Sequence, residues 1–439
     1  MECPVSGSLS KAQFNQQLLN FLEKSPTPFH AVSSSVDVLE DAGFQQLEED
    51  QKWALKAGGK YYVIRNHSSI IAFTLADNFE ATTPFNMVGA HTDSPCLKVK
   101  PEPEIASKNY FQLGVEVYGG ALLNPWFDRD LSLAGRVSYL TRQQKIKSAL
   151  IDFKSPVAII PSLAIHLDRN ANENRSINKQ QHLPPILSVC DDKEKDSFHN
   201  LLISQIEKSS ENHEIEKVLD HELFFYDTQS PAFIGLKDSF IASARLDNLL
   251  SCYIALQSMV SVNDQPGSNL IVFSDHEEVG SASSSGAQGP FLKSVLKRIY
   301  VSSESFARAM HQSLMISADN AHGVHPNYAD KHDDNHGPIL NAGPVIKINA
   351  NQRYATNSET SAMFKHFCDM CDVPYQNFVV RSDMGCGSTI GPITATELGV
   401  KTVDIGLPTF GMHSIRELAG VDDGFSLYQV FNYYFSHRN

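Results

Sequence analysis

The feature that most constrains this chain is a pair of adjacent glutamates that follows an apolar run. Residues 269–273 (NLIVF) are typical of a buried strand, and Glu277 and Glu278 come shortly after it. Neighbouring carboxylates raise each other's pKa unless a cation neutralises one of them. An exposed acidic turn explains most such pairs, whereas in a dinuclear metal hydrolase one glutamate binds metal and its neighbour carries the proton. The rest of the chain decides between these two interpretations.

Length and composition limit the class of protein. The 439 residues exceed one ordinary core and predict two domains, with 42% hydrophobic and 20% charged residues as in globular proteins. A net charge of -14 disfavours a nucleic-acid partner, and no apolar run has the roughly 18 residues of a membrane span. The start of the chain lacks the features of a secretory signal, and seven scattered cysteines favour reduced thiols. We therefore expect a cytoplasmic protein without a membrane partner.

Apolar periodicity divides the chain into three parts. Residues 1–98 and 232–439 alternate helical and strand patterns, which predicts an α/β sheet with helices on both faces. Residues 99–231 instead place Pro-rich and Gly-rich turns between short apolar runs such as 157–160 and 163–166, which are strand-like. We interpret this middle part as an inserted β-rich domain.

The individual elements follow from the same patterns. Strands are predicted at 61–65, 70–75, 85–90, 270–273, 314–318, 345–348, 378–380 and 402–405, and helices at 10–24, 28–42, 198–207, 246–256, 291–299, 389–398 and 425–435.

Residues that can bind a metal lie just past the ends of four predicted strands. They are His91, Glu277, Glu278, Asp319 and His413. Because sites in open α/β sheets lie outside the carboxyl ends of the strands, this shared location favours a common function. Histidine and carboxylate ligands suit zinc, with manganese or cobalt as possible substitutes.

Two aspartates each leave two interpretations open. A pair of metals needs a bridging carboxylate, and Asp247, at the start of a predicted helix, is the candidate; it could equally cap that helix. Asp93, two residues after His91, is either a surface turn residue or the carboxylate that fixes the ring tautomer of His91.

Several segments together resemble the successive signature blocks of the aspartyl aminopeptidase family of dinuclear zinc metallopeptidases. Six of them, in order, are HTDSP (91–95), SARLDN (243–248), DHEEVGS (275–281), SADNAH (317–322), KINANQRYAT (347–356) and GMHS (411–414). FDRDL (127–131) and LAIHL (163–167) extend the resemblance into the insertion.

The resemblance implies a metal centre and a fold. One zinc would be held by His91, Asp247 and Asp319, and a second by Asp247, Glu278 and His413, with Asp247 bridging and Glu277 as general base. The implied architecture is a catalytic domain with a central mixed sheet flanked by helices, plus an inserted β-rich dimerisation domain. The resemblance further implies a tetrahedral homododecamer built from dimers.

The resemblance also implies a role for His166 in catalysis, because the matching histidine reaches the active site of a neighbouring subunit. From its apolar neighbours alone, His166 would be interpreted as a buried core histidine.

The implied reaction removes the N-terminal residue of peptides, preferably Asp or Glu, with a water activated by two zinc ions. An acidic first residue needs a cation, for which Lys347 is the best candidate and Tyr354 and Arg381 are further pocket residues. Lys347 could instead be an edge-strand lysine that prevents aggregation. The alternative functions are another dinuclear zinc amidohydrolase (an N-acyl amino acid deacylase or carboxypeptidase) or a catalytically idle self-assembling shell.

Overall fold

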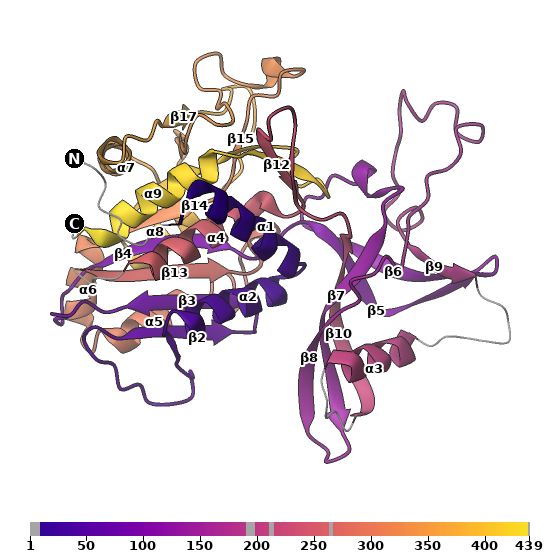
Figure 1. Cartoon of the computed structure of the whole chain (residues 1–439), viewed down its shortest axis with the longest axis horizontal. Coiled ribbons are helices and arrows are strands. Elements are labelled where there is room, and N and C mark those ends of the chain that lie inside the picture. The colour runs from indigo at the N-terminus through magenta and orange to yellow at the C-terminus, as the bar shows by residue number, and fades with distance from the viewer. Residues whose placement is uncertain (1–8, 190–197, 210–214, 263–266, 438–439) are drawn as a thin grey trace. The chain divides into compact units, whose positions relative to one another are not determined.

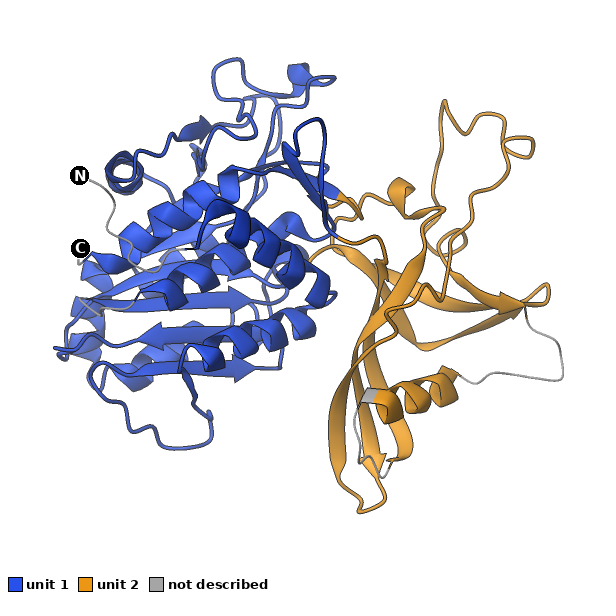
Figure 2. Cartoon of the chain, viewed as in Figure 1, with its two compact units in different colours: residues 1–93, 231–412, 417–439 blue, residues 94–230, 413–416 orange. Residues whose placement is uncertain are grey.

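The computed structural model describes residues 9–189, 198–209, 215–262 and 267–437, which form two compact units. The first unit contains residues up to Asp93, residues 231–412 and residues from 417 onward. The second unit contains residues 94–230 and 413–416 (Figure 2). The second unit thus begins at 94, where the sequence predicted 99, and ends at 230, where it predicted 231.

A mixed nine-stranded sheet forms the centre of the first unit (Figure 1). Its order is β1 (Gln45–Gln46), β2 (Lys60–Arg65), β3 (Ser69–Thr74), β13 (Ser268–Ser274), β4 (Phe85–His91), β14 (Leu314–Ala318), β18 (Lys401–Gly406), β16 (Val345–Lys347) and β17 (Gln376–Phe378). The central strands β13, β4, β14 and β18 are parallel, while β3 and β16 pair with them antiparallel. The carboxyl ends of four neighbouring strands therefore meet at one edge of the sheet.

Helices cover both faces of this sheet, as the alternating pattern predicted. One face carries α1 (Lys11–Lys24), α2 (Pro28–Asp41), α4 (Leu246–Ser261), α7 (Ser358–Met370) and α9 (Asp423–Ser436); the other carries α5 (Phe291–Ile299), α6 (Ser303–Gln312) and α8 (Ile390–Leu398).

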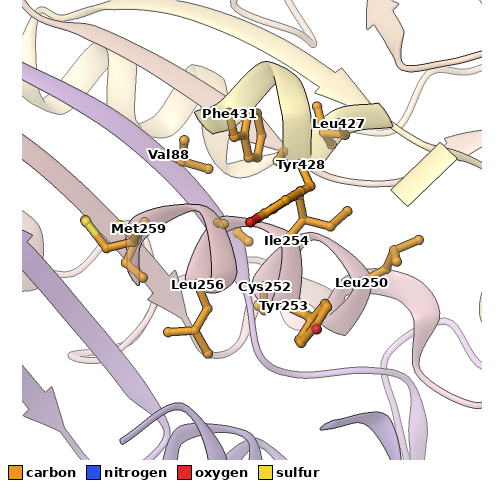
Figure 3. Packing of buried hydrophobic residues seen from close by; sticks show 14 of the residues in the cluster. Val88, Leu250, Cys252, Tyr253, Ile254, Leu256, Met259, Leu427, Tyr428 and Phe431 are labelled. Atoms are coloured by element: carbon orange, nitrogen blue, oxygen red, sulfur yellow. The ribbon is translucent and has the colours of Figure 1, made fainter. Parts of the chain in front are cut away.

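The core of the first face is built around α4. Figure 3 shows Leu250 and Ile254 of α4 among Tyr428 and Phe431 of α9 and Val88 of β4. All five side chains are at most 1% exposed. Burying a side chain of this size contributes about 1.5–3 kcal/mol, so this packing fixes α4 against β4. The beginning of α4 is consequently held at the carboxyl edge of the sheet.

A smaller sheet completes the first unit. Its order is β11 (Ala232–Ile234), β12 (Phe240–Ser243), β20 (Glu417–Gly420), β19 (Pro408–Phe410) and β15 (Ala321–His322).

The second unit is an antiparallel sheet with its own core. The strand order is β8 (Ile146–Asp152), β7 (Leu131–Thr141), β10 (Ile215–Asp227), β5 (Cys96–Ser107), β6 (Tyr110–Tyr118) and β9 (Ile186–Val189). Helix α3 (Phe198–Ser209) packs on β8 and β10. The buried hydrophobic residues of the second unit form a cluster that is separate from the clusters of the first unit.

The structure corrects some predicted elements. Residues 163–166 are not a strand but an exposed turn, and 157–160 makes only isolated bridges, to Leu131 and Ile186. Strand β17 ends at Phe378, where the predicted strand began. Helices α6 and α7 were not predicted, although Ser302 and Asn357 cap their first turns. In the described parts of the chain, every helix is too short or too polar to span a bilayer.

His221 provides a test of the packing in the second unit. This residue of β10 is 9% exposed, and its ring lies edge-on to Phe198 of α3 at 5.5 Å. Burial lowers the pKa of His221 below its ordinary value. Because the unfolded chain then binds a proton more readily, His221 should cost stability as the pH falls through about 6.5. We expect the melting temperature of wild type to drop relative to His221→Leu between pH 7.5 and 5.5; a pH-independent difference would contradict this.

Candidate metal centre and active site

Three of the predicted ligands converge at the carboxyl edge of the large sheet. His91 ends β4, Asp247 lies in the first turn of α4, and Glu278 lies in a short 3-10 helix (Glu277–Val279) after β13. Each offers a ligand atom within 4.8 Å of the other two. His91 and Asp247 are 1% and 3% exposed, so the order of the strands brings distant residues into one buried cluster.

Asp319, just after β14, joins this cluster. Its Oδ1 lies 3.6 Å from His91 Nε2, and Asp247 Oδ1 lies 3.7 Å from the same nitrogen. Two atoms bound tetrahedrally to one zinc at about 2.0–2.2 Å are about 3.3–3.6 Å apart. The nitrogen and carboxylate donors therefore fit zinc in kind, and their spacing lies at or within about 0.1 Å of the upper end of this range.

Asp93 contacts His91 and both glutamates, and so holds three members of the site in place. It is completely buried, and its two carboxylate oxygens accept hydrogen bonds from the backbone N–H groups of Glu277 and Glu278, each at 3.1 Å. His91 Nδ1 lies 2.9 Å from the backbone oxygen of Asp93 and 3.3 Å from its Oδ1. The surface-turn interpretation of Asp93 is wrong, because one residue fixes both the His91 ring and the glutamate pair.

Asp247 is held by contacts that the sequence did not reveal. Its backbone N–H donates to Glu417 Oε2 at 2.8 Å, and the next residue, Asn248, donates from Nδ2 to the Ala318 carbonyl at 2.8 Å. Helix α4, all of which is described, begins without a side-chain cap. The carboxylate of Asp247 faces His91, which contradicts the capping interpretation. The only sequence signal for Glu417 is its position three residues after the GMHS segment.

The cluster attracts positive charge. Burial disfavours the protonated form of His91, but the carboxylates of Asp247, Asp319 and Asp93 outweigh it and raise the pKa of His91 well above its ordinary value. Burial raises the pKa of Glu277 to about 8; His91 opposes this shift, and the neighbouring carboxylates add to it. So many buried carboxylates require protons or a cation.

Lys347 supplies one positive charge. It ends β16, its side chain is 3% exposed, and its Nζ lies 3.4 Å from Asp319 Oδ2 and 5.3 Å from the ring centre of Tyr354. Strand β16 lies between β18 and β17, so the edge-strand interpretation of Lys347 is wrong.

A cavity of about 180 Å³ opens beside Tyr354. It is far larger than the roughly 10–15 Å³ that one water molecule needs. Its lining includes Arg381, Cys386 and His322. Arg381 lies with its guanidinium on the carboxylate of Asp383, at 2.7 and 2.9 Å. Of the predicted pocket residues, Tyr354 and Arg381 line this cavity, whereas Lys347 is buried next to Tyr354.

Two predicted site residues belong to the second unit. His413 has its Nδ1 3.3 Å from the Gly120 carbonyl, and its own carbonyl accepts a hydrogen bond from Leu122 N–H. His166 lies in the exposed turn, so the interpretation as a core histidine is wrong. The metal role of His413 and the catalytic role of His166 stay predictions.

Comparison with known proteins gives a consistent result along the chain. Residues 21–435 match the family described as aminopeptidase I zinc metalloprotease (M18). A probable M18 family aminopeptidase 2 of Azotobacter vinelandii is 58% identical over 428 residues, which cover 97% of this chain and 99% of the relative. One of the same name from Pseudomonas putida GB-1 is 59% identical over 426 residues, covering 97% and 98%.

Solved structures agree with these matches. The structure of the Ape4 and Nbr1 complex superimposes with a TM-score of 0.94 at 37% identity, covering 99% of this chain and 88% of the other. The S. cerevisiae mApe1 dodecamer gives 0.82 at 29%, covering 96% of each chain. An M18 aminopeptidase from Thermotoga maritima gives 0.83 at 25%, covering 97% and 96%.

The position of Asp93 generates a prediction. An asparagine at this position cannot accept hydrogen bonds from both glutamate N–H groups, so Asp93→Asn should loosen His91 and Glu278 together. We expect zinc affinity to fall about 10–100-fold, measured by competition with a chelator. The exposed Asp372→Asn is the control, and zinc affinity equal in both variants would show that Asp93 does not support the metal centre.

Proposed function

The chain belongs to the aminopeptidase I zinc metalloprotease (M18) family, and from this premise we propose that it removes N-terminal Asp or Glu from peptides with the help of two zinc ions. The observation that carries the acidic preference is the buried Nζ of Lys347, 3.4 Å from Asp319. A cation beside the proposed ligand Asp319 supports this preference, because the first residue of a bound peptide would lie close to the zinc ions.

The proposed ligands divide into two sets that share one residue. His91, Asp247 and Asp319 would hold one zinc, and Asp247, Glu278 and His413 the other. The mutual spacing of His91, Asp247 and Glu278 supports this assignment, because it suits a carboxylate between two ions. When bound, zinc lowers the pKa of water and polarises a peptide carbonyl. Manganese or cobalt could replace it.

Glu277 is the proposed proton carrier. Its backbone N–H is fixed by Asp93 Oδ1 at 3.1 Å, which leaves the side-chain carboxylate to accept a proton. In the reaction, Glu277 Oε takes the proton of the attacking water and later delivers it to the nitrogen of the leaving amine. The neighbouring Glu278 serves as a ligand, so each member of the pair has its own task.

Recognition of the first residue is assigned to Lys347 and Tyr354. Lys347 attracts the substrate's side-chain carboxylate, and Tyr354 forms a wall of the cavity beside it. Arg381 lines the same cavity but lies against Asp383, so we give it a lesser part in attracting an acidic peptide.

We propose a homo-oligomer, a tetrahedral dodecamer built from dimers, in which His166 acts in a neighbouring subunit. The residues that flank His166 support this: Leu163, Ile165 and Leu167 are 59%, 47% and 74% exposed. A partner subunit would cover these apolar side chains. Among the similar solved structures, that of S. cerevisiae mApe1 is a dodecamer.

Glu277 and Glu278 should respond differently to the same substitution. Glu277→Gln should retain zinc and lose about 10²–10⁴-fold in kcat, because it removes only the proton acceptor. Glu278→Gln should lose both zinc and activity. Metal content by elemental analysis and kcat on an N-terminal Asp peptide check this; a Glu277→Gln enzyme with full zinc and near-normal kcat would remove Glu277 from its role.

Lys347→Met tests the acidic preference. The variant keeps an unbranched side chain, one atom shorter than that of lysine, and removes the charge. We expect kcat/KM for N-terminal Asp or Glu peptides to fall by at least about tenfold more than for Leu peptides, because a bond to a charged group is lost. Zinc content must be measured in parallel, because Lys347 also contacts Asp319. An equal loss on both substrates would refute the pocket assignment.

A further inference from the structure

One buried carboxylate near the proposed pocket has no part in the mechanism so far. Asp404 lies in the middle of β18 and is completely buried. On one side, Asp404 pairs with Ser317 of β14. On the other side, β16 pairs Val345 with Gly406 and Ile346 with Ile405 of β18, and continuing this antiparallel register places Lys347 opposite Asp404. Residues that lie opposite each other on antiparallel strands point to the same face of the sheet. Asp404 therefore lies on the same face as Lys347.

The carboxylate of Asp404 joins two segments that are distant in sequence. Asp404 Oδ2 accepts a hydrogen bond from the Ala355 backbone N–H at 2.6 Å, and Oδ1 accepts one from Thr389 Oγ1 at 2.6 Å. Thr389 is the N-cap of α8, whose second residue is Gly391. An added Cβ at Gly391 would lie only 2.2 Å from Asp404 Oδ1, so the start of α8 is fitted closely against this carboxylate.

These two segments adjoin two of the walls of the cavity, which is also lined by residues 378–381 and by His322, Lys331 and His332. One wall is Tyr354, next to Ala355, and the other is the loop 384–387, just before Thr389. The walls also contact each other, because Arg353 Nε donates to the Cys386 carbonyl at 3.3 Å. Gly385 and Gly387 have open space where a Cβ would be, so this wall is not packed closely against neighbouring atoms at these two positions.

We infer that the cavity beside Tyr354 receives the first residue of the peptide, and that Asp404 is a positioning residue that sets the distance between two walls of this pocket and thereby its selectivity for acidic side chains. It does not touch the reacting atoms. A carboxylate accepts stronger hydrogen bonds than a neutral oxygen does. The two hydrogen bonds that Asp404 accepts, from Ala355 and Thr389, therefore hold both walls at a fixed separation. This inference rests on the proposed acidic preference and adds the residue that shapes the pocket.

Substitutions at both ends of the contact test this role. Asp404→Asn keeps the shape but loses the charge, and Thr389→Val removes one donor, whereas Thr389→Ser keeps it. Thr402→Val is the matched control, because Thr402 is a buried residue of the same strand whose hydroxyl donates to the Val400 carbonyl. The readout is the ratio of kcat/KM for an N-terminal Asp peptide to that for an N-terminal Ala peptide, whose methyl group does not fill the pocket.

We expect this ratio to fall about tenfold in Asp404→Asn and severalfold in Thr389→Val, with the Ala peptide and zinc content little changed. It should stay at the wild-type value in Thr389→Ser and Thr402→Val. An unchanged ratio in Asp404→Asn, or an equal fall in Thr402→Val, would overturn the inference. If Asp404→Asn does not fold, Thr389→Val against Thr389→Ser decides. A wild-type enzyme without acidic preference would instead overturn the proposed function.

Discussion

The structure depends on the crowding of carboxylates around one buried imidazole. The carboxylates of Asp247, Asp319 and Glu278 lie close to the His91 ring. Asp93 accepts a hydrogen bond from the backbone N–H of Glu278. In isolation these groups would be costly to bury, because like charges repel and water is excluded. A bound cation would replace this repulsion between carboxylates with attraction to the cation. Binding of a metal here would therefore be linked to the folding of this edge.

The sheet makes this crowding possible. Strands β13, β4 and β14 are parallel neighbours, so the residues that follow them emerge at one edge. Helix α4 brings Asp247 to the same edge because its apolar side chains are packed between β4 and α9. Lys347 reaches the site from β16, which runs in the opposite direction. The lysine and the clustered carboxylates thus come from strands of opposite direction, and they meet where Lys347 Nζ lies 3.4 Å from Asp319 Oδ2.

Much of this arrangement could be predicted from the sequence, and the misses have physical causes. Strands such as β14 are mostly apolar runs because both faces are buried, and residues that can bind a metal follow several of these runs. Helix α6 escaped prediction because, of its side chains, only Ala309 and Met310 are buried, which leaves a weak apolar stripe. The turn around His166 was mistaken for a strand because its apolar residues point outward, which composition does not reveal.

Glu417 and Asp404 were missed for a different reason. Each is an ordinary acidic residue whose role depends on a backbone N–H group far away along the chain, 170 residues for Glu417 and 49 for Asp404. Such partners are set by tertiary structure alone.

The central claim is that His91, Asp247, Glu278, Asp319 and His413 bind two zinc ions. Anomalous scattering from crystals of the zinc-loaded enzyme, recorded on both sides of the zinc absorption edge, tests it most directly. The account predicts two peaks on either side of the Asp247 carboxylate, about 3.5–4 Å apart. A single peak, or zinc bound elsewhere with these five side chains not in contact with it, would contradict the account.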